Sequence, residues 1–442
     1  MTDNSYLQGL SKVGAAFGPL TVAFIGSSTM QRFFGATAVT PALANPGNDS
    51  FWGAALAFLK APWRVVGVLG TDGATFDTRA YDGPELIART RPNIVVLGLG
   101  VNDMNLTALP TVTSRLDYVS AYVRQVAATG GVVIIPTIHA LSFSNTAVKA
   151  AWMADFNSRL LQMGENNPNL LVLNIAVLAL VHDVSGTYAT MSSSYSTDLV
   201  HWNSAGCVIV GRELARQISL KAPHLLRGGD LFVNNLGVAT TDPRGILRNG
   251  LNLGSQAASG GVTGTMPAAP WETANLGTNH AAVASIVARD ATDPIPGNWV
   301  RFEVTQGLSW TALSNRVIIR RNSLDFAGAG VPVGTWMQAM AEVRWPNATI
   351  ASDGAPYPSL QFVNNAGTSV TVQTGQQAFN NVPILWRAGE VIVLRTAPFK
   401  LFATTSTHRL DLTFFTQAVS SGYTVDVGRM GLDILDFTNT IV

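Results

Sequence analysis

The first half of the chain contains five short, unbroken runs of apolar residues, and these runs constrain the fold more than any other feature. An unbroken apolar run indicates a strand covered on both faces, whereas a strand with one solvent face alternates apolar and polar residues. The sequence therefore predicts a parallel sheet. Its expected strands are Leu20–Ile25, Arg64–Leu69, Asn93–Leu99, Val132–Pro136 and Leu170–Ile175.

Longer segments with apolar residues at helical spacing separate these runs. The clearest is Thr113–Thr129, and the glycine pair that follows it is a helix stop signal. Strands that alternate with helices are connected by right-handed crossovers, so this order predicts a three-layer α/β/α domain over residues 1–225. The other expected helices are Asp49–Lys60, Thr146–Met163 and Ser204–Leu220.

The sequence changes character after about Arg227, where Gly, Asn, Thr and Ser become frequent and helical periodicity fades. Several short runs alternate apolar and polar residues, as half-buried antiparallel strands do. We expect a jelly-roll-like β-sandwich over residues 286–442, with residues 226–285 as a linker or as the start of this domain. The expected strands are Trp299–Thr305, Asn315–Arg320, Trp336–Trp345, Ser359–Val363, Ser369–Gln373, Glu390–Arg395, Arg409–Phe415 and Tyr423–Val427.

Charge and cysteine content exclude several classes of function. The 442-residue chain has a formal net charge of +1, which gives no reason to expect nucleic acid as a partner. No stretch of about 18 apolar residues lacks polar breaks, so we expect no membrane span. The single cysteine, Cys207, excludes an intrachain disulfide and cysteine-based zinc or redox motifs, and we expect it to be buried. The histidines form no His-x-His pattern, so we expect no catalytic metal and no cofactor.

A glycine and three hydroxyl residues, Gly26-Ser27-Ser28-Thr29, follow the first expected strand. Open parallel sheets form their sites at the carboxyl ends of the strands. There a glycine permits a tight turn, and the N-terminus of the next helix stabilises negative charge. A serine in this position is a candidate nucleophile. The alternative is that these hydroxyl groups only cap a helix.

Two further polar segments lie where they could complete a site. Asn102 and Asp103 follow the third expected strand, where the Asn102 amide can donate to an oxyanion or, alternatively, form an Asx-turn or helix cap. Asp198-Leu199-Val200-His201 precedes the last expected helix of the α/β domain. A carboxylate three residues before a histidine can reach its Nδ1 and leave Nε2 free for a serine, although a surface turn is the simpler explanation of this segment alone.

Together, in this order and strand context, the three segments resemble the SGNH (GDSL-type) hydrolase family over about residues 18–220. The resemblance implies a flavodoxin-like α/β/α fold with Ser28 as nucleophile, His201 as general base and Asp198 as its orienting carboxylate. It also implies an oxyanion hole formed by the Ser28 N–H, the Gly73 N–H and the Asn102 side chain. Gly70 is the competing choice for Gly73.

The resemblance has one departure, because the common Gly-Asp-Ser motif reads Gly-Ser-Ser here. Ser27 occupies the position of that aspartate, which is not a member of the catalytic triad, so activity is expected to survive. Position in the motif favours Ser28 over Ser27 as nucleophile. His139 follows the fourth expected strand and is a candidate substrate contact, whereas the other histidines compete poorly as catalytic bases. They are His182, which is adjacent to Asp183, and His224, His280 and His408, outside the expected site.

The resemblance and the expected β-domain lead to a functional hypothesis. Members of the family hydrolyse lipid esters, thioesters and acetyl groups on sugars, and β-sandwich modules attached to such hydrolases often bind carbohydrate. We therefore expect a serine esterase that removes O-acetyl groups from a polysaccharide. The alternatives are a lipase or thioesterase, and a non-catalytic carbohydrate-binding protein of a virion or cell surface. Tryptophans that could stack on sugars, or lie in the core, are Trp271, Trp299, Trp310, Trp336, Trp345 and Trp386.

The start of the chain bears on its location. Its first residues, MTDNSYLQGLSKVG, have no basic start followed by an apolar run, so they do not read as a signal peptide. A virion-associated or cytoplasmic protein fits this, as does a secreted protein whose leader has been removed. The low charge and the Gly/Asn/Thr-rich C-terminal half also fit a deacetylase of a phage tail, and such proteins are often homotrimers.

Overall fold

The computed structural model describes much of the chain, which divides into two compact units. The N-terminal unit consists mainly of Asp49–Leu231 together with the first strand, and the C-terminal unit mainly of Phe232–Leu435. The residues described are 20–31, 51–59, 63–178 and, with short gaps, 182–226, then 235–236, 254–306 with short gaps, 316–350 with short gaps, 357–364, 372–374, 385–401 with one gap, 408–415 and 422–435. The first 19 residues and Trp310 lie outside them.

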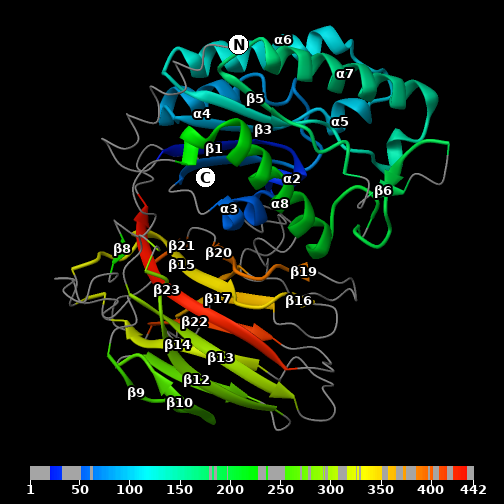
Figure 1. Cartoon of the computed structure of the whole chain (residues 1–442). Coiled ribbons are helices and arrows are strands. Elements are labelled where there is room, and N and C mark those ends of the chain that lie inside the picture. The colour runs from blue at the N-terminus through cyan, green and yellow to red at the C-terminus, as the bar shows by residue number, and fades with distance from the viewer. Residues whose placement is uncertain are drawn as a thin grey trace. The chain divides into compact units, whose positions relative to one another are not determined.

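A five-stranded parallel sheet forms the centre of the N-terminal unit, in the order β2-β1-β3-β4-β5 (Figure 1). The strands coincide with the five apolar runs to within two residues at each end. This arrangement confirms the predicted α/β/α fold class. The strands are β1 (Thr21–Gly26), β2 (Arg64–Gly70), β3 (Ile94–Gly98), β4 (Val132–Pro136) and β5 (Leu170–Leu173).

Helices cover both faces of this sheet (Figure 1). The helices α6 (Val112–Ala127) and α7 (Ala147–Glu165) lie on one face, and α3 (Phe51–Leu59) packs against α8 (Ser204–Lys221) on the other. Thr111 and Asn203 cap α6 and α8 through side-chain oxygens that accept from backbone N–H groups. The predicted helices are therefore present, with each end within two residues of the expected position.

Three short helices are absent from the sequence-based expectation. They are α2 (Ser28–Gln31), α4 (Asp82–Thr90) and α5 (Val101–Met104). The helix α4 contains Gly83 and Pro84, which usually mark turns, but a proline in a first helical turn removes no intrahelical hydrogen bond. The other two have only four residues each, too few for a helical period to be visible in the sequence.

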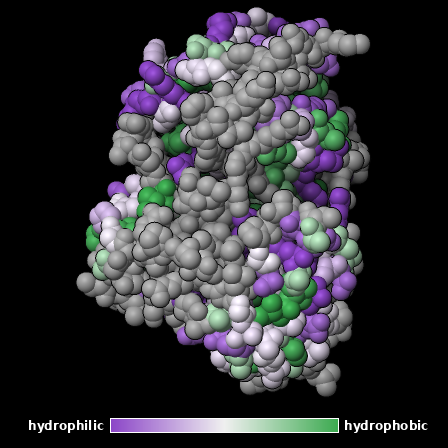
Figure 2. Space-filling view, turned by 60° about the vertical axis from the view of Figure 1, so that its left-hand side comes forward, coloured by the Kyte–Doolittle hydropathy of each residue, from purple (hydrophilic) through white to green (hydrophobic). Residues whose placement is uncertain are grey.

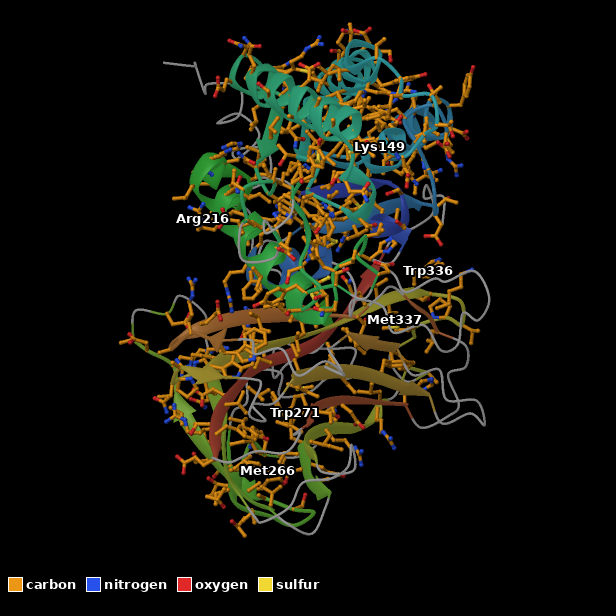
Figure 3. The ribbon with its side chains drawn as sticks, turned by 90° about the vertical axis from the view of Figure 1, so that its right-hand side faces the viewer. Lys149, Arg216, Met266, Trp271, Trp336 and Met337 are labelled. Atoms are coloured by element: carbon orange, nitrogen blue, oxygen red, sulfur yellow. The ribbon has the colours of Figure 1, made fainter. Side chains whose placement is uncertain are left out.

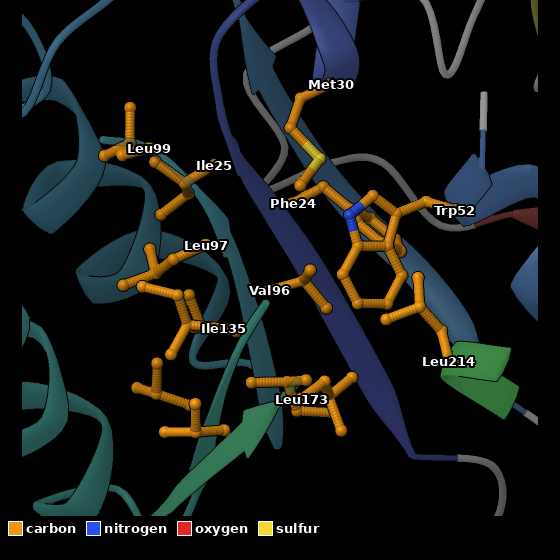
Figure 4. Close-up of a cluster of buried hydrophobic side chains, with 14 of the residues drawn as sticks. Phe24, Ile25, Met30, Trp52, Val96, Leu97, Leu99, Ile135, Leu173 and Leu214 are labelled. Atoms are coloured by element: carbon orange, nitrogen blue, oxygen red, sulfur yellow. The ribbon is translucent and has the colours of Figure 1, made fainter. Parts of the chain in front are cut away.

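The core of this unit lies on both sides of β1, because successive side chains of a strand point to opposite faces. Phe24 contacts the ring of Trp52 on one side, with ring centroids 6.0 Å apart, and Ile25 lies among Leu97 and Leu99 on the other (Figure 4). All these side chains are buried. The middle of the sheet is thus covered by apolar groups on both faces, and polar chemistry is confined to the strand ends.

The described residues of the C-terminal unit lie mostly in strands, as predicted, and these form two larger sheets. The first has the order β20-β15-β23-β13-β12-β10-β9, with β21 paired to β15 and β8 paired to β23. Its strands are β8 (Asn235–Leu236), β9 (Gln256–Ala257), β10 (Val262–Met266), β12 (His280–Ala288), β13 (Asn298–Gln306), β15 (Trp336–Trp345), β20 (Glu390–Arg395), β21 (Phe399–Lys400) and β23 (Tyr423–Leu435).

The second sheet has the order β11-β14-β22-β17-β18, and residues 226–285 therefore contribute strands to both sheets. The rings of Phe302 and Phe414, from β13 and β22, lie 6.5 Å apart between the two sheets. Trp271 is buried on β11, and β15 carries the buried Met337 beside the half-buried Trp336 (Figure 3). The strands are β11 (Trp271–Leu276), β14 (Arg316–Leu324), β17 (Tyr357–Asn364), β18 (Val372–Thr374) and β22 (His408–Phe415).

A cluster of buried charges lies within this all-β unit. The carboxylate of Glu342, on β15, accepts hydrogen bonds from the backbone N–H of Arg429 at 3.0 Å and from its Nη2 at 2.8 Å, and it pairs with Arg289. All three side chains are at most 4% exposed. Burial acts to raise the pKa of Glu342, but the two guanidinium groups more than offset it, so its pKa lies below the ordinary value.

Replacing Glu342 with Gln removes the carboxylate that Arg289 and Arg429 share, and Asp293 remains as a partner of Arg289 at 3.1 Å. We expect the C-terminal unit to lose about 3–5 kcal/mol of unfolding free energy, because buried guanidinium groups are then left without this carboxylate. Differential scanning calorimetry measures the change. Glu303→Gln, on the exposed face of β13, is the matched control and should change stability by less than about 0.5 kcal/mol. Equal stability of the two variants would contradict the expectation.

Candidate active site

The end of β1 brings a serine to the carboxyl edge of the sheet. Gly26 is the last residue of this strand, and a Cβ atom there would lie 2.8 Å from the Gly98 carbonyl oxygen of β3 and 2.5 Å from Met30. The close approach of β1 and β3 therefore requires glycine at position 26. The next residue, Ser27, is buried, and its hydroxyl donates to the Gly98 carbonyl at 3.4 Å. Ser28 then begins α2.

A continuous chain of hydrogen bonds joins Ser28, His201 and Asp198. The Ser28 Oγ lies 2.8 Å from the His201 Nε2, and the His201 Nδ1 lies 2.6 Å from the Asp198 Oδ2. A carboxylate at Nδ1 keeps the proton on that nitrogen, so Nε2 is an acceptor for the serine hydroxyl. The arrangement can activate an oxygen nucleophile.

The turn that carries His201 is held by its own backbone. The second oxygen of Asp198 accepts from the N–H groups of Val200 at 2.9 Å and His201 at 2.7 Å. Leu199, between Asp198 and Val200, has a φ of 59°, an uncommon conformation for a residue with a branched side chain. The Ser196 hydroxyl donates to the His201 carbonyl at 2.7 Å. These contacts hold His201 in place although it lies in neither a helix nor a strand.

The charge of Asp198 is favoured in this turn. Partial burial acts to raise its pKa, but hydrogen bonds from the His201 ring and from two backbone N–H groups outweigh it, so its pKa is lowered. Asp198 therefore remains a carboxylate through the neutral range, as a group that stabilises a positive imidazolium must.

The loop after β2 carries the two glycines considered as oxyanion donors. Gly70 is the last residue of β2 and pairs with Gly26, whereas Gly73 lies in an exposed turn with a φ of +75° and open space around its α-carbon. The next residue, Ala74, accepts a hydrogen bond at 3.0 Å from the Asn102 Nδ2. Asn102 lies in α5, directly after β3, so the structure ties this side chain to the turn that contains Gly73.

His139 lies in a buried group of aromatic rings next to the turn formed by residues 198–201. Its ring is 4% exposed and packs on Trp202, with centroids 3.9 Å apart, and the ring of His182 lies parallel to it at 6.5 Å. Burial, and to a lesser extent His182, lowers the pKa of His139 to about 3, so the imidazole is neutral. Its suggested role as a substrate contact stays a prediction.

Sequence reasoning did not single out a buried ion pair beneath the loop after β2. Asp103 is fully buried, its Oδ1 lies 2.8 Å from the Arg115 Nε of α6, and it accepts from the Phe76 N–H at 3.2 Å. Arg115 also donates to Asp77 at 2.9 and 2.6 Å. The only sequence signal was the adjacency of Asp103 to Asn102, which does not reveal that the carboxyl group is buried.

Within the described residues, no group of three or more His, Cys, Asp or Glu side chains is arranged to hold a metal ion. Of the helices in the described ranges, none is long and apolar enough to cross a membrane. Cys207 is buried on α8, as expected.

Burial of Asp103 predicts a pH-dependent stability term. Burial raises its pKa to about 6, although Arg115 and the Phe76 N–H act to lower it. Because an unfolded aspartate titrates near about 4, this group favours the folded state most at low pH, and the contribution is lost as the pH rises through about 6. The unfolding free energy of the wild type relative to Asp103→Asn should therefore fall by about 2 kcal/mol between about pH 4 and pH 6.

Denaturant titrations at a series of pH values measure this difference. Thr113→Val, at an exposed position of α6, is the control, and its difference from the wild type should not vary over the same range because neither side chain titrates there. A constant difference between the wild type and Asp103→Asn from pH 4 to pH 7 would contradict the raised pKa.

Comparisons with known proteins bear on the N-terminal unit. Solved structures similar to the chain include a GDSL-like lipase from Bacteroides thetaiotaomicron (15% identity, TM-score 0.34), which matches 50% of this chain and 98% of its own. An acetyl xylan esterase (15%, TM-score 0.35) matches 45% of this chain and 100% of its own. An α/β hydrolase enzyme from the metagenome of Lake Arreo, Spain (17%, TM-score 0.36) matches 48% and 99%.

The search of curated proteins found no match. The model of the GDSL-like lipase/acylhydrolase family matches residues 24–208, which include the second half of β1, the strands β2 to β5 and all three polar segments described above. Residues 24–208 of this chain therefore form a domain of the GDSL-like lipase/acylhydrolase family.

Proposed function

We propose that the N-terminal unit is a serine esterase in which Ser28 is the nucleophile, His201 the general base and Asp198 the carboxylate that orients it. The observation that carries this proposal is the unbroken hydrogen-bonded chain from the Ser28 Oγ through the imidazole to the Asp198 carboxylate. Its position at the carboxyl end of a central parallel strand is where such sheets bind their ligands.

The chain of hydrogen bonds supports a two-step acyl transfer. The Ser28 Oγ attacks the ester carbonyl carbon while its proton passes to the His201 Nε2. The tetrahedral intermediate collapses, the C–O bond to the alcohol breaks, and the imidazolium returns the proton to the leaving oxygen. Water then attacks the acyl-enzyme with the same histidine as base, which releases the acid and regenerates Ser28. Throughout, the Asp198 carboxylate stabilises the charged imidazolium.

We assign the oxyanion hole to the Ser28 N–H, the Gly73 N–H and Asn102. The Asn102 Nδ2 carries two hydrogens, and its bond to the Ala74 carbonyl uses one of them and fixes the plane of the amide. The other is available for the developing negative charge. Gly73 is preferred to Gly70 because Gly70 belongs to the strand ladder with Gly26, whereas Gly73 lies in an open turn next to the residue that Asn102 binds.

We propose a short acyl group, with O-acetylated polysaccharide as the substrate class. A site for long acyl chains requires contiguous apolar surface. In the described part of the N-terminal unit, the large apolar residues that are exposed lie on separate segments, and hydrophilic and hydrophobic residues are interspersed over the face in Figure 2. These exposed residues are Tyr81, Leu106, Val148, Val177 and Leu220.

The tryptophans of the C-terminal unit add little to the case for carbohydrate. Four of those that could stack on sugars are at most 3% exposed and are therefore core residues, namely Trp271, Trp299, Trp345 and Trp386. Trp336 is half-buried with Lys400 over its ring. The polysaccharide proposal thus depends on the chemistry of the Ser28 site, and on the general association of such hydrolases with β-rich modules.

Hydrolysis of p-nitrophenyl esters of increasing acyl length tests the nucleophile and the acyl preference together. We expect acetate to be cleaved faster than butyrate or octanoate, and Ser28→Ala to reduce kcat by at least about 10³-fold because the attacking oxygen is gone. Ser27→Ala is the matched control, since the Ser27 hydroxyl is buried against the Gly98 carbonyl, and it should retain most of the activity.

Each alternative function has its own outcome in this experiment. A preference for octanoate over acetate would indicate a lipase or acyl thioesterase. Cleavage by Ser28→Ala at the wild-type rate would show that another residue is the nucleophile. No cleavage of any ester, including acetylated polysaccharides, would indicate a binding protein.

Removal of the Asn102 amide tests the oxyanion assignment. We expect Asn102→Ala to lower kcat by about 10²–10³-fold with little change in KM, because the lost hydrogen bond acts mainly in the transition state. Steady-state kinetics with p-nitrophenyl acetate measure both constants. Asn105→Ala, at the exposed end of the same helix, is the control. Full activity of Asn102→Ala would show that this side chain is not an oxyanion donor.

A further inference from the structure

A buried arginine connects the strand of Ser28 to the loop of Gly73. Arg79 lies at the end of this loop and is 3% exposed. Its Nε donates to the Gly26 carbonyl at 3.2 Å, and its Nη2 donates to the Thr71 hydroxyl at 2.6 Å. One planar guanidinium group therefore contacts both the residue two positions before Ser28 and the residue two positions before Gly73.

Two further hydrogen bonds hold Arg79, one at its third guanidinium nitrogen and one at its backbone carbonyl. Its Nη1 pairs with Asp82 at 2.5 Å, and its backbone carbonyl accepts from the Tyr122 hydroxyl of α6 at 2.5 Å. A buried guanidinium is costly to desolvate, and one carboxylate and two neutral acceptors are its partners here. Because the group is planar and has five donors in a fixed arrangement, it can hold several acceptors at set distances from one another.

The turn that contains Gly73 depends on such contacts because residues 71–73 are exposed. The Ala74 N–H closes the turn by donating to the Thr71 carbonyl at 3.1 Å, and a side-chain hydrogen bond holds it on each side of Gly73. Arg79 binds Thr71, and Asn102 binds Ala74. An oxyanion donor has to point at the developing charge to within a few tenths of an ångström, so both contacts bear on the reaction.

We propose that Arg79 is a positioning residue that sets the placement of the Gly73 turn relative to Ser28, acting through its hydrogen bonds to Thr71 and Gly26. The inference rests on the proposed function, since it needs Ser28 as nucleophile and Gly73 as oxyanion donor. Arg79 itself need not touch substrate. A misplaced oxyanion donor weakens transition-state binding but leaves substrate binding nearly unchanged. A change at Arg79 should therefore lower kcat and leave KM nearly unchanged.

Two substitutions test this on p-nitrophenyl acetate. Arg79→Lys keeps a positive charge for Asp82 but has a single nitrogen that cannot bridge Gly26 and Thr71 in the same geometry. Thr71→Val removes one acceptor at an exposed position and leaves Arg79 in place. We expect kcat to fall about 10–100-fold for Arg79→Lys and about 3–10-fold for Thr71→Val, with KM within about twofold of the wild type in both.

Matched controls exist for both changes. Arg89→Lys alters an exposed arginine of α4, and Thr113→Val removes an exposed hydroxyl that accepts from Arg159 at 3.2 Å. Neither should alter kcat. Because Arg79 acts partly through Thr71, the two losses should be non-additive, with the double variant nearly as active as Arg79→Lys alone. Thermal unfolding of each variant shows whether a loss of activity comes from misfolding. If Arg79→Lys is misfolded, the kcat of Thr71→Val alone tests the role of Arg79.

The outcomes separate this inference from the proposed function. Wild-type kcat in Thr71→Val and Arg79→Lys, together with an inactive Ser28→Ala, would overturn the role of Arg79 and leave the serine esterase standing. A rise in KM at unchanged kcat, or fully additive losses, would also overturn it. An inactive wild type would contradict the proposed function itself, and the inference with it.

Discussion

The parallel pairing of β1 with both β2 and β3 determines where everything else in the N-terminal unit lies. This pairing ends at Gly26, Gly70 and Gly98, which stand side by side at the carboxyl edge of the sheet. The segments that follow the three strands carry Ser28, Gly73 and Asn102, so the register brings these segments to the same edge of the sheet. Only His201 and Asp198 come from outside this edge, on a turn stabilised by its own backbone N–H groups.

The sheet itself could be predicted because its signal is local. Val132–Pro136 is found with the expected bounds, since an apolar run with polar flanks has only one stretch that can be buried on both faces. Strands of the C-terminal unit were also visible as short β-rich runs, and Trp336–Trp345 and Glu390–Arg395 are found with the expected bounds. The order of the three polar segments along the chain then indicated which side chains meet at the carboxyl edge.

The supporting polar residues could not be predicted in the same way. Arg79, Asp103 and Arg115 read as ordinary loop and surface residues, because a charged side chain is buried only if partners from distant segments satisfy it. Those partners, such as the Gly26 carbonyl for Arg79, become visible only once the strands are paired. Helix α4 was missed for a related reason, since Gly83 and Pro84 suggest a turn and packing against α6 and β2 overrides that preference.

The hydrogen bond between Ser28 and His201 joins residues 173 positions apart in the sequence. Closing so long a loop costs conformational entropy, and that cost is met only when the intervening strands and helices have packed. The pair therefore forms only where the strands and helices that carry its two residues have packed. A partly folded chain, or a nascent one that has not yet emerged as far as α8, holds the serine without its base. Reactivity of the serine thus becomes a measure of how completely this unit has folded.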